Sequence, residues 1–298
     1  MDKIQLIKYK FIDFYKWDTL VKKYSKGLPY AYSWYLNSVC EEWNLIIYGD
    51  YQAGFAFQVK KKFGLSYSLQ PFLTQQLGFF GEDINIFSNI INKLNKTVFH
   101  YHYQLNHFNK VSNNIVSEKP NFELSLNNTW KEIFNNYKTN TKRNLKKASV
   151  NQIEIINNNQ FQLEDFDFII KNSKIDFNGI RITQFKRLMQ NAHHNTALEV
   201  YRAINNNELV ALVIFIKTKI RSVYLLAVTN KKGLETKANF LLVDHFIKEN
   251  AQSQTILDFE GSNIEGVARF YTGFGAHKTT YQEIKKTCLK KFIIKLFN

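Results

Sequence analysis

Two acidic residues near the C-terminus have a spacing that could support proton transfer. Asp258 and Glu260 are two residues apart, in a segment whose pattern predicts a short strand at residues 255–259. Side chains two residues apart in a strand project from the same face, so either carboxylate could orient an amine or accept its proton. The alternative is structural, with Asp258 capping a loop and Glu260 pairing with a lysine. We take both as candidate catalytic residues.

Three short blocks follow one another in this part of the chain. They are Asp258-Phe259-Glu260-Gly261-Ser262, then Gly266-Val267-Ala268, then Phe270-Tyr271-Thr272-Gly273-Phe274-Gly275. The Gly261-Ser262 turn would let the backbone approach a ligand closely, or would only reverse the chain. We include Gly261, Ser262, Phe270 and Tyr224, which lies in a predicted strand at residues 220–228, among the candidate substrate-binding residues.

The ordered set of blocks resembles the C-terminal signature of the FemAB-like peptidoglycan-bridge aminoacyltransferases, which are tandem GNAT-like domains. The segment 140–148 is similar to the basic interdomain helix of that family. The resemblance implies attack of an amine on an activated carbonyl, which requires aligned reactants, removal of a proton and stabilisation of an oxyanion. Backbone N–H groups on splayed strands can serve this chemistry, so it needs no nucleophile motif of the Gly-x-Ser-x-Gly kind.

Tyr271 departs from the pattern of that family. Many bridge-forming relatives have Phe-Lys where this sequence has Phe270-Tyr271. A phenol can donate a hydrogen bond to an oxyanion but carries no positive charge. We therefore expect Tyr271 to be the third candidate catalytic residue, and the chemistry to differ from strict bridge formation.

The segment 230–237 is the candidate binding loop for coenzyme A. GNAT acetyltransferases hold the pyrophosphate on backbone amides of a glycine-containing loop at a helix N-terminus. This sequence keeps Gly233 but has Glu235 where the pattern has a small residue, and its lysines could offset that charge. The candidate cofactor-binding residues are Lys231, Lys232, Gly233 and Lys237; a solvated strand-to-helix turn is the alternative.

Two further segments are candidates for substrate binding. Lys142, Arg143, Lys146 and Lys147 form a cationic ridge at i, i+4 spacing, which could hold the phosphates of tRNA or of a nucleotide-activated precursor or could be a solvated face. Gln70, Gln75 and Gln76 lie in an otherwise apolar loop, where unpaired amides are costly to bury. These glutamines could bind the acceptor, or one another and the loop backbone.

The elements that must position these residues are predicted from hydrophobic periodicity and turn residues. The first half has two helices, three strands, a helix and a strand, at 14–26, 32–42, 43–48, 52–61, 65–69, 84–94 and 97–105. A strand and two helices follow, at 121–126, 129–137 and 139–148. The second half has a strand, two helices, three strands, then alternating helices and strands, at 152–156, 164–176, 183–192, 197–205, 209–217, 220–228, 236–250, 255–259, 265–271 and 278–285.

The order in the second half resembles that of GNAT N-acyltransferases, and the first half shows a similar order. We therefore predict an α/β (α+β) protein with two tandem GNAT-like domains, each a mixed, mostly antiparallel sheet flanked by helices. The boundary is placed at the end of the basic helix. This gives an N-terminal domain of residues 1–150 and a C-terminal domain of residues 151–298.

Composition limits the possible classes of protein. The 298 residues have a mass of 35.2 kDa and are 45% apolar with only 12 Gly and 3 Pro, which excludes a disordered or collagen-like chain. The net charge of +15 is spread over both halves, so a nucleic-acid-binding tail is excluded and a shallow basic groove is not. Cys40 and Cys288 are the only cysteines, so no disulfide framework or cysteine zinc site is expected.

No metal site and no membrane insertion are expected. His100 and His102 alternate on one predicted strand, and His193-His194 ends a helix, where an imidazolium suits the helix dipole. The N-terminus lacks an apolar signal stretch, and the longest apolar run, 209–216, falls short of the roughly 20 residues that span a bilayer. The basic amphipathic segment 289–297 could touch a membrane surface or pack on the second domain. We expect a cytoplasmic protein.

Three functions are compatible with the sequence. The first is a FemAB-like N-acyltransferase that moves an aminoacyl or acyl group onto an amine of a phosphate-bearing cell-envelope precursor. The second is an acetyl-coenzyme A-dependent GNAT acting on an amino sugar or small amine. The third is a catalytically degenerate binding module. No permanently bound cofactor is expected, and the acyl donor would be either an aminoacyl-tRNA or an acyl-coenzyme A.

Overall fold

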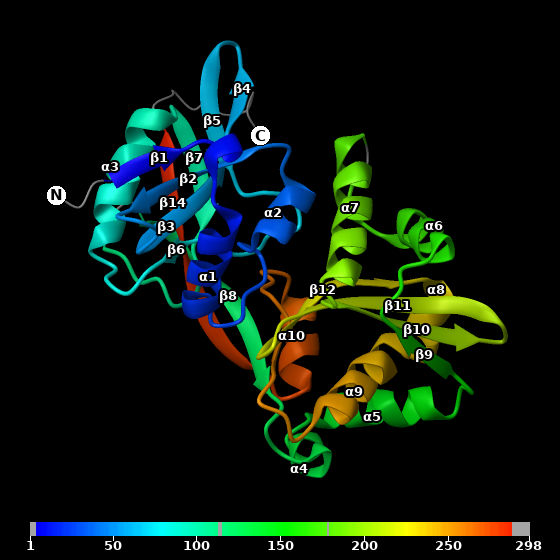
Figure 1. The fold of residues 1–298 in the computed structure, drawn as a ribbon. Helices are drawn as coiled ribbons and strands as arrows, with labels where there is room; N and C mark the ends of the chain where they lie inside the picture. The colour runs from blue at the N-terminus through cyan, green and yellow to red at the C-terminus, as the bar shows by residue number, and fades with distance from the viewer. Residues whose placement is uncertain (1–3, 113–114, 178, 288–298) are drawn as a thin grey trace. The chain divides into compact units, whose positions relative to one another are not determined.

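The computed structural model describes residues 4–112, 115–177 and 179–287, and the chain forms two compact units (Figure 1). Unit 1 consists of residues 1–119 and 280–298, and unit 2 consists of residues 120–279. The chain passes from unit 1 to unit 2 within strand β8 (Ile115–Ser125) and returns within strand β14 (His277–Thr287). Cys288 and the segment 289–297 lie outside the described residues.

Unit 1 contains two sheets and three α-helices in its described part. Its elements are β1 (Ile4–Ile7), a 3-10 turn (Tyr9–Phe11), α1 (Phe14–Tyr24), α2 (Ser33–Val39), β2 (Trp43–Tyr48), β3 (Ala53–Gln58), β4 (Lys60–Lys62), β5 (Leu65–Leu69), β6 (Phe79–Phe80), α3 (Ile86–Thr97) and β7 (His100–Gln104). One sheet has the strand order β1-β2-β3-β6, and the second has the order β4-β5-β7-β14. The predicted strand 52–61 is divided into β3 and β4, and β4 pairs with β5 as an antiparallel hairpin.

Unit 2 is built on one sheet with the strand order β8-β13-β12-β11-β10-β9. Its elements are α4 (Trp130–Asn135), α5 (Thr139–Ser149), β9 (Glu154–Asn158), α6 (Leu163–Asn172), α7 (Ile180–His194), β10 (Leu198–Asn205), β11 (Glu208–Lys217), β12 (Arg221–Thr229), α8 (Lys231–Thr236), α9 (Ala238–Asn250), β13 (Ile256–Asp258) and α10 (Glu265–Gly273). Only the β12–β13 pair is parallel among the described pairs of this sheet. The second-half order of elements is thus as the sequence predicts, with α8 added before α9.

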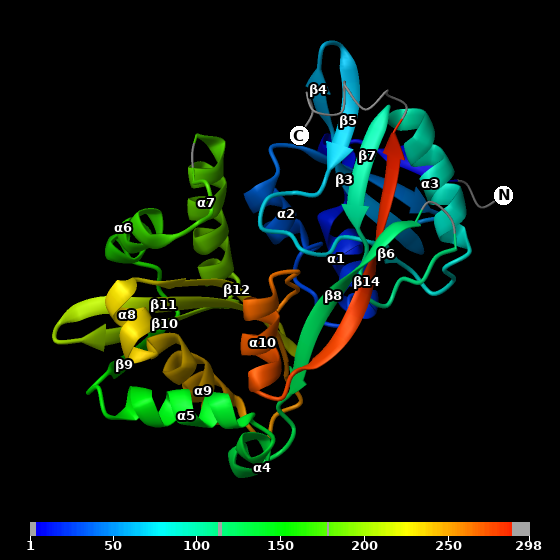
Figure 2. The same ribbon diagram turned by 180° about the vertical axis from the view of Figure 1, so that it is seen from behind.

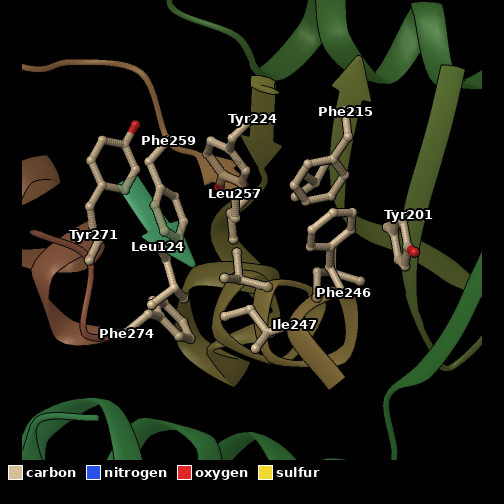
Figure 3. Packing of buried hydrophobic residues seen from close by; sticks show 14 of the residues in the cluster. Leu124, Tyr201, Phe215, Tyr224, Phe246, Ile247, Leu257, Phe259, Tyr271 and Phe274 are labelled. Atoms are coloured by element: carbon tan, nitrogen blue, oxygen red, sulfur yellow. The ribbon is translucent and has the colours of Figure 1, made fainter. Parts of the chain in front are cut away.

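The core of unit 2 lies between the sheet and helix α9 (Figure 3). Phe215 of β11 stacks on Phe246 of α9, with ring centroids 3.9 Å apart and planes at 15°. Tyr224 of β12 contacts Phe215 edge-on and the ring of Phe259 at an angle. Burial of such rings stabilises a fold by roughly 1.5–3 kcal/mol each, so this cluster fixes the position of the strands that carry the candidate site.

The division into units differs from the predicted boundary at residue 150. Leu145 of α5 and Ile133 of α4 are buried in the core of unit 2, so both helices belong to that unit. At the other end, β14 pairs antiparallel with β7 from Glu283 opposite Gln104 onward, so the last strand belongs to unit 1. A single boundary along the sequence cannot divide the chain into these units, because unit 1 contains residues from both ends of the chain.

The described residues contain neither a membrane-crossing helix nor a clustered metal-ligand set. No helix in the described ranges is long and apolar enough to cross a bilayer. Within those ranges, no group of three or more His, Cys, Asp or Glu side chains is placed to hold a metal ion. The Nε2 atom of His102 in β7 instead lies 3.5 Å from Oε1 of Glu283 in β14. Cys40 is buried in unit 1.

Candidate functional site

Strand β12 has an unpaired edge in the centre of the unit 2 sheet. Its parallel pairing with β13 covers only Arg221, Ser222 and Val223, whereas β12 continues to Thr229. Beyond Val223, no strand of the described residues pairs with this edge. Because alternate residues of a strand direct their N–H groups to opposite edges, the stretch 224–229 presents backbone donors on this side. This is the splayed geometry that the sequence resemblance implied.

A β-bulge lies at the start of the unpaired stretch. Ile214 of β11 is opposite Leu226, and Phe215 is opposite Tyr224, so Leu225 is the extra residue. A bulge locally bends a strand and redirects its backbone groups, and such bulges are common beside active sites. The irregularity therefore coincides with the point where β12 loses its neighbour.

A pocket of about 340 Å³ occupies the space beside this stretch, entirely within unit 2. Its wall is formed by the unpaired part of β12, the first turn of α9, the segment after β13, and helix α10. The lining residues are Tyr224, Leu225, Leu226, Ala227, Asn239, Glu260, Gly266, Val267, Phe270 and Tyr271. Four of the residues proposed from the sequence, Tyr224, Glu260, Phe270 and Tyr271, thus meet in one pocket.

Tyr271 supplies a phenol to this pocket. Its ring stacks on Phe259 with centroids 4.9 Å apart and planes at 26°, and the hydroxyl points away from Phe274 (Figure 3). The residue is 9% exposed, and no hydrogen bond joins its hydroxyl to another described residue. Burial raises the pKa of Tyr271, so the hydroxyl stays protonated at neutral pH and is available as a donor.

The hydroxyl of Tyr224 has a protein partner instead. It donates to Asn239 Oδ1 at 3.2 Å, or accepts from Asn239 Nδ2 at 2.9 Å. Burial raises the pKa of this phenol as well. Tyr224 and Asn239 therefore link β12 to the first turn of α9 and shape the pocket wall.

Asp258 lies in a buried ionic network and outside the pocket lining. Its side chain is fully buried, and Arg221 Nη1 donates to Asp258 Oδ2 at 2.6 Å and to Glu123 Oε1 at 2.8 Å. Asn121 Nδ2 donates to Asp258 Oδ1 at 3.1 Å. Burial raises the pKa of the Asp258 carboxyl, and the guanidinium of Arg221 opposes that shift.

Glu260 does not share a strand face with Asp258, so this prediction is wrong. Strand β13 ends at Asp258, and Glu260 has a left-handed backbone with φ of 60°. The Glu260 N–H donates to Asp258 Oδ1 at 2.9 Å, and Phe122 N–H donates to the Glu260 carbonyl at 3.0 Å. Asp258 thus holds the backbone that places the Glu260 side chain at the pocket. The resulting roles are distinct: a positioning residue and a pocket carboxylate.

Gly261 and Ser262 form the turn before α10. The Ser262 hydroxyl accepts a hydrogen bond from the Ile264 N–H at 3.0 Å, which stabilises that turn. Neither residue is part of the pocket lining. These contacts support the interpretation that the turn only reverses the chain.

The proposed coenzyme A loop forms helix α8, which is capped by its own residues. Asn230 Oδ1 accepts from the Gly233 N–H at 2.8 Å, and Lys232 Nζ donates to the Asn205 carbonyl at 3.1 Å. Lys231 is exposed, and Lys237 joins α8 to α9 with φ of 64°. The hollow beside α8 is lined by four carboxylates as well as three lysines: Glu164, Asp167, Glu208, Glu235, Lys171, Lys231 and Lys232. Such a mixed lining does not favour a pyrophosphate.

Gly233 serves packing, which leads to a stability prediction. A Cβ at this position would lie 2.2 Å from the Val210 carbonyl oxygen, a backbone atom that cannot turn aside. We expect Gly233→Ala to lower the free energy of unfolding by about 1–3 kcal/mol, the usual cost of overpacking. Thermal unfolding followed by circular dichroism would measure it. Gly266→Ala in helix α10, where nothing lies within 4 Å of the new Cβ, is the matched control; an equal loss in both variants would contradict the packing argument.

The cationic ridge is present on helix α5 as predicted. Arg143, Lys146 and Lys147 are exposed, and Lys142 is half-buried. Lys142 Nζ donates to the Asn135 carbonyl at 2.9 Å, and Arg143 Nη2 donates to Asn140 Oδ1 at 2.8 Å. The ridge belongs to unit 2 through Leu145, which packs in its core.

The glutamine loop of unit 1 is held by its own hydrogen bonds. Gln76 Oε1 accepts from the His107 N–H at 2.7 Å, and Gln76 Nε2 donates to Gln75 Oε1 at 3.0 Å. Gln70 Oε1 accepts from the Gln104 N–H at 3.1 Å. Gln75 and Gln76 therefore form hydrogen bonds with each other and with the backbone, which is the alternative to binding the acceptor. Gln70 Nε2 is buried without a partner among the described residues.

Comparisons with known proteins show the fold. No protein-family model matches the sequence, and the search of curated proteins finds no match. Among solved structures, FemX superposes with a TM-score of 0.67 at 10% identity, over 98% of this chain and 99% of that chain. A tandem GNAT protein from the clavulanic acid biosynthesis pathway gives 0.57 at 6% identity, over 97% and 100%. L-PGS from Bacillus licheniformis gives 0.56 at 10% identity, over 95% and 94%. The predicted fold, two tandem GNAT-like units, is confirmed.

Proposed function

We propose that the protein is an N-acyltransferase whose reaction takes place in the unit 2 pocket. The observation that carries this proposal is the coincidence of three features: the unpaired edge of β12, its bulge at Leu225, and a pocket lined by Tyr271 and Glu260. Acyl transfer needs donors for an oxyanion and a base or anion for the amine. The pocket offers both kinds of group in its lining.

The roles follow from the protonation and position of each group. The Tyr271 hydroxyl, kept protonated by its raised pKa, would donate to the oxyanion together with a backbone N–H of β12. The Glu260 carboxylate would orient the attacking ammonium or accept its proton. Tyr224 and Phe270 would form an aromatic wall of the pocket against which the substrate packs. Asp258 would act only through Glu260.

The substrates are proposed from the resemblance to the FemAB-like family. An aminoacyl group carried by tRNA would be transferred to an amine of a phosphate-bearing envelope precursor in the cytoplasm. The ridge on α5, with Lys142, Arg143 and Lys146, would attract the phosphates of either substrate electrostatically. Such binding would weaken as salt increases, because counterions are released on association.

Acetyl-coenzyme A is the second candidate donor, and one feature favours it. Helix α9 starts at Ala238 without a side-chain cap, next to Lys237, and its second residue, Asn239, lines the pocket. A helix N-terminus of this kind can bind phosphate on its free N–H groups. This site would replace the α8 loop as the place for the pyrophosphate.

Isothermal titration with tRNA, acetyl-coenzyme A and a UDP-linked muropeptide tests the proposal. Binding of tRNA and the muropeptide supports the first donor, and binding of acetyl-coenzyme A without tRNA supports the second. Turnover with the donor that binds would exclude a catalytically degenerate module. If none of the three binds, the transferase assignment fails.

A further inference from the structure

The β4–β5 hairpin of unit 1 carries an exposed phenylalanine at its tip. Phe63 is 76% exposed and Leu65 is 38% exposed, and Figures 1 and 2 both show the hairpin extending beyond the rest of unit 1. Only Tyr67, Ser68 and Leu69 pair with β7. Among the strands of the described residues, the stretch 61–65 forms ladder pairs only within the hairpin.

Phe63 is unfavourable at this position on two counts. Its backbone has φ of 51°, and Gly64 follows with φ of 76°, the left-handed geometry that glycine and asparagine adopt far more easily than a bulky residue. Its apolar ring is also exposed to water, which is unfavourable; a polar side chain at this position would not have this cost. A strained and exposed aromatic residue is an observation that calls for a functional explanation.

The charge of the hairpin is uniformly positive. Lys60, Lys61 and Lys62 are all exposed, and the sequence has no acidic residue between Asp50 and Glu82. Lys60 pairs with Tyr67 and Lys62 with Leu65, and side chains directly opposite in a hairpin share a face. One face of the hairpin therefore presents two lysines, a tyrosine and a leucine, with Phe63 at its end.

We propose that this hairpin docks on an anionic lipid bilayer, with Phe63 and Leu65 entering the interface and Lys60 and Lys62, on the same face as Leu65, contacting lipid headgroups. The combination of aromatic and aliphatic side chains with lysines is the composition of surfaces that lie in a membrane interface. Lysines near an anionic surface add attraction that weakens beyond a Debye length. The hairpin would bring the protein to the membrane without spanning it.

The lysines alone have a simpler explanation, which Phe63 does not share. β4 is the edge strand of its sheet, and lysines on an edge strand prevent pairing with other chains. That function is served by charge and is weakened by an exposed phenylalanine at the tip. Nucleic acid would also attract the lysines, but it offers no apolar layer for Leu65. Lipid is the partner that accounts for the charge and the apolar tip together.

Flotation of the full chain with vesicles tests the proposal. The vesicles would contain phosphatidylcholine alone, or phosphatidylcholine with about one third phosphatidylglycerol, the charge that basic segments recognise. We expect the wild-type protein to float with the anionic vesicles only. Phe63→Ser should lower the partition coefficient about tenfold, because one apolar anchor is lost. Replacing Lys60 and Lys62 by Gln should lower it roughly fivefold for each lysine.

Phe11→Ser is the matched control for Phe63→Ser. Phe11 is also an exposed phenylalanine of unit 1, 68% exposed, with Lys10 Nζ at 4.7 Å from its ring centroid. This variant should float as the wild type does, and both phenylalanine variants should keep the wild-type melting temperature because both rings are largely exposed. The proposal is overturned if the wild type does not bind anionic vesicles, if Phe11→Ser loses as much binding as Phe63→Ser, or if the hairpin variants lose tRNA binding and keep vesicle binding. None of these outcomes depends on the transferase function of unit 2.

Discussion

Replacing Arg221 by methionine is expected to destabilise the protein by about 3–5 kcal/mol, as measured for other buried pairs that lose one partner. Arg221 is 1% exposed and lies between the carboxylates of Asp258 and Glu123, which are also buried. Without the guanidinium, two buried carboxylates face each other with no cation between them. We expect a lower melting temperature in calorimetry and a lower midpoint in urea.

Lys217→Met is the matched control, because it removes a cation from a surface pair in the same unit. Lys217 pairs with Glu199, and its side chain is 45% exposed. An exposed pair contributes about 0–1 kcal/mol, so this variant should unfold close to the wild type. Equal losses in the two variants would show that the buried network has no special energetic weight.

The destabilisation of Arg221→Met should depend on pH. Burial raises the pKa of Asp258 in the folded protein, and Arg221 opposes that rise. A carboxyl whose pKa is raised on folding binds its proton more tightly in the folded state, so its contribution to stability is present at low pH and is lost as pH rises through the folded pKa. Removing Arg221 raises the pKa of folded Asp258 further, because the opposing guanidinium is lost. The deficit of the variant relative to wild type should therefore be smaller near about pH 5 than near about pH 8, and a deficit independent of pH would contradict this account.

The local part of the fold could be predicted from the sequence because its signals are local. The apolar residues of β10, β11 and β12, which form a continuous run in β11, and the turn residues between these strands predict three antiparallel strands, which the structure confirms. The division into units could not be predicted, because it depends on β14 pairing with β7 across about two-thirds of the chain. The hydrophobic periodicity of a strand does not indicate which distant strand it pairs with.

The candidate site divides in the same way. Tyr271, Glu260, Tyr224 and Phe270 could be selected from their residue types and spacing, and they line one pocket. The spacing of Asp258 and Glu260 gave the wrong geometry, because the strand ends at Asp258 and the chain then turns left-handed. Arg221 was missed entirely: it lies 37 positions from Asp258 and 98 from Glu123, and a single arginine at the start of a strand gives no sequence signal of a buried network.

Tyr271→Phe is expected to lower kcat about a hundredfold while KM changes little, the usual effect of removing one oxyanion donor. This prediction rests on the proposed transferase function. The substitution removes a single hydroxyl from a ring that stays packed on Phe259. Because that hydroxyl makes no hydrogen bond to another described residue, the variant should be as stable as the wild type. Steady-state kinetics with the donor identified by titration, together with thermal unfolding, would measure both quantities.

Tyr224→Phe separates this role from a general effect on the pocket. The Tyr224 hydroxyl also lies in the pocket wall, but it is bonded to Asn239 at 2.9 Å. Its removal should cost about 1 kcal/mol of stability, the net value of one hydrogen bond, and should lower kcat much less than Tyr271→Phe. The two variants thus have opposite expected patterns, activity lost with stability kept for Tyr271 and the reverse for Tyr224. If Tyr271→Phe keeps full activity, oxyanion stabilisation must come from the backbone of β12 alone, and the phenol has no part in the reaction.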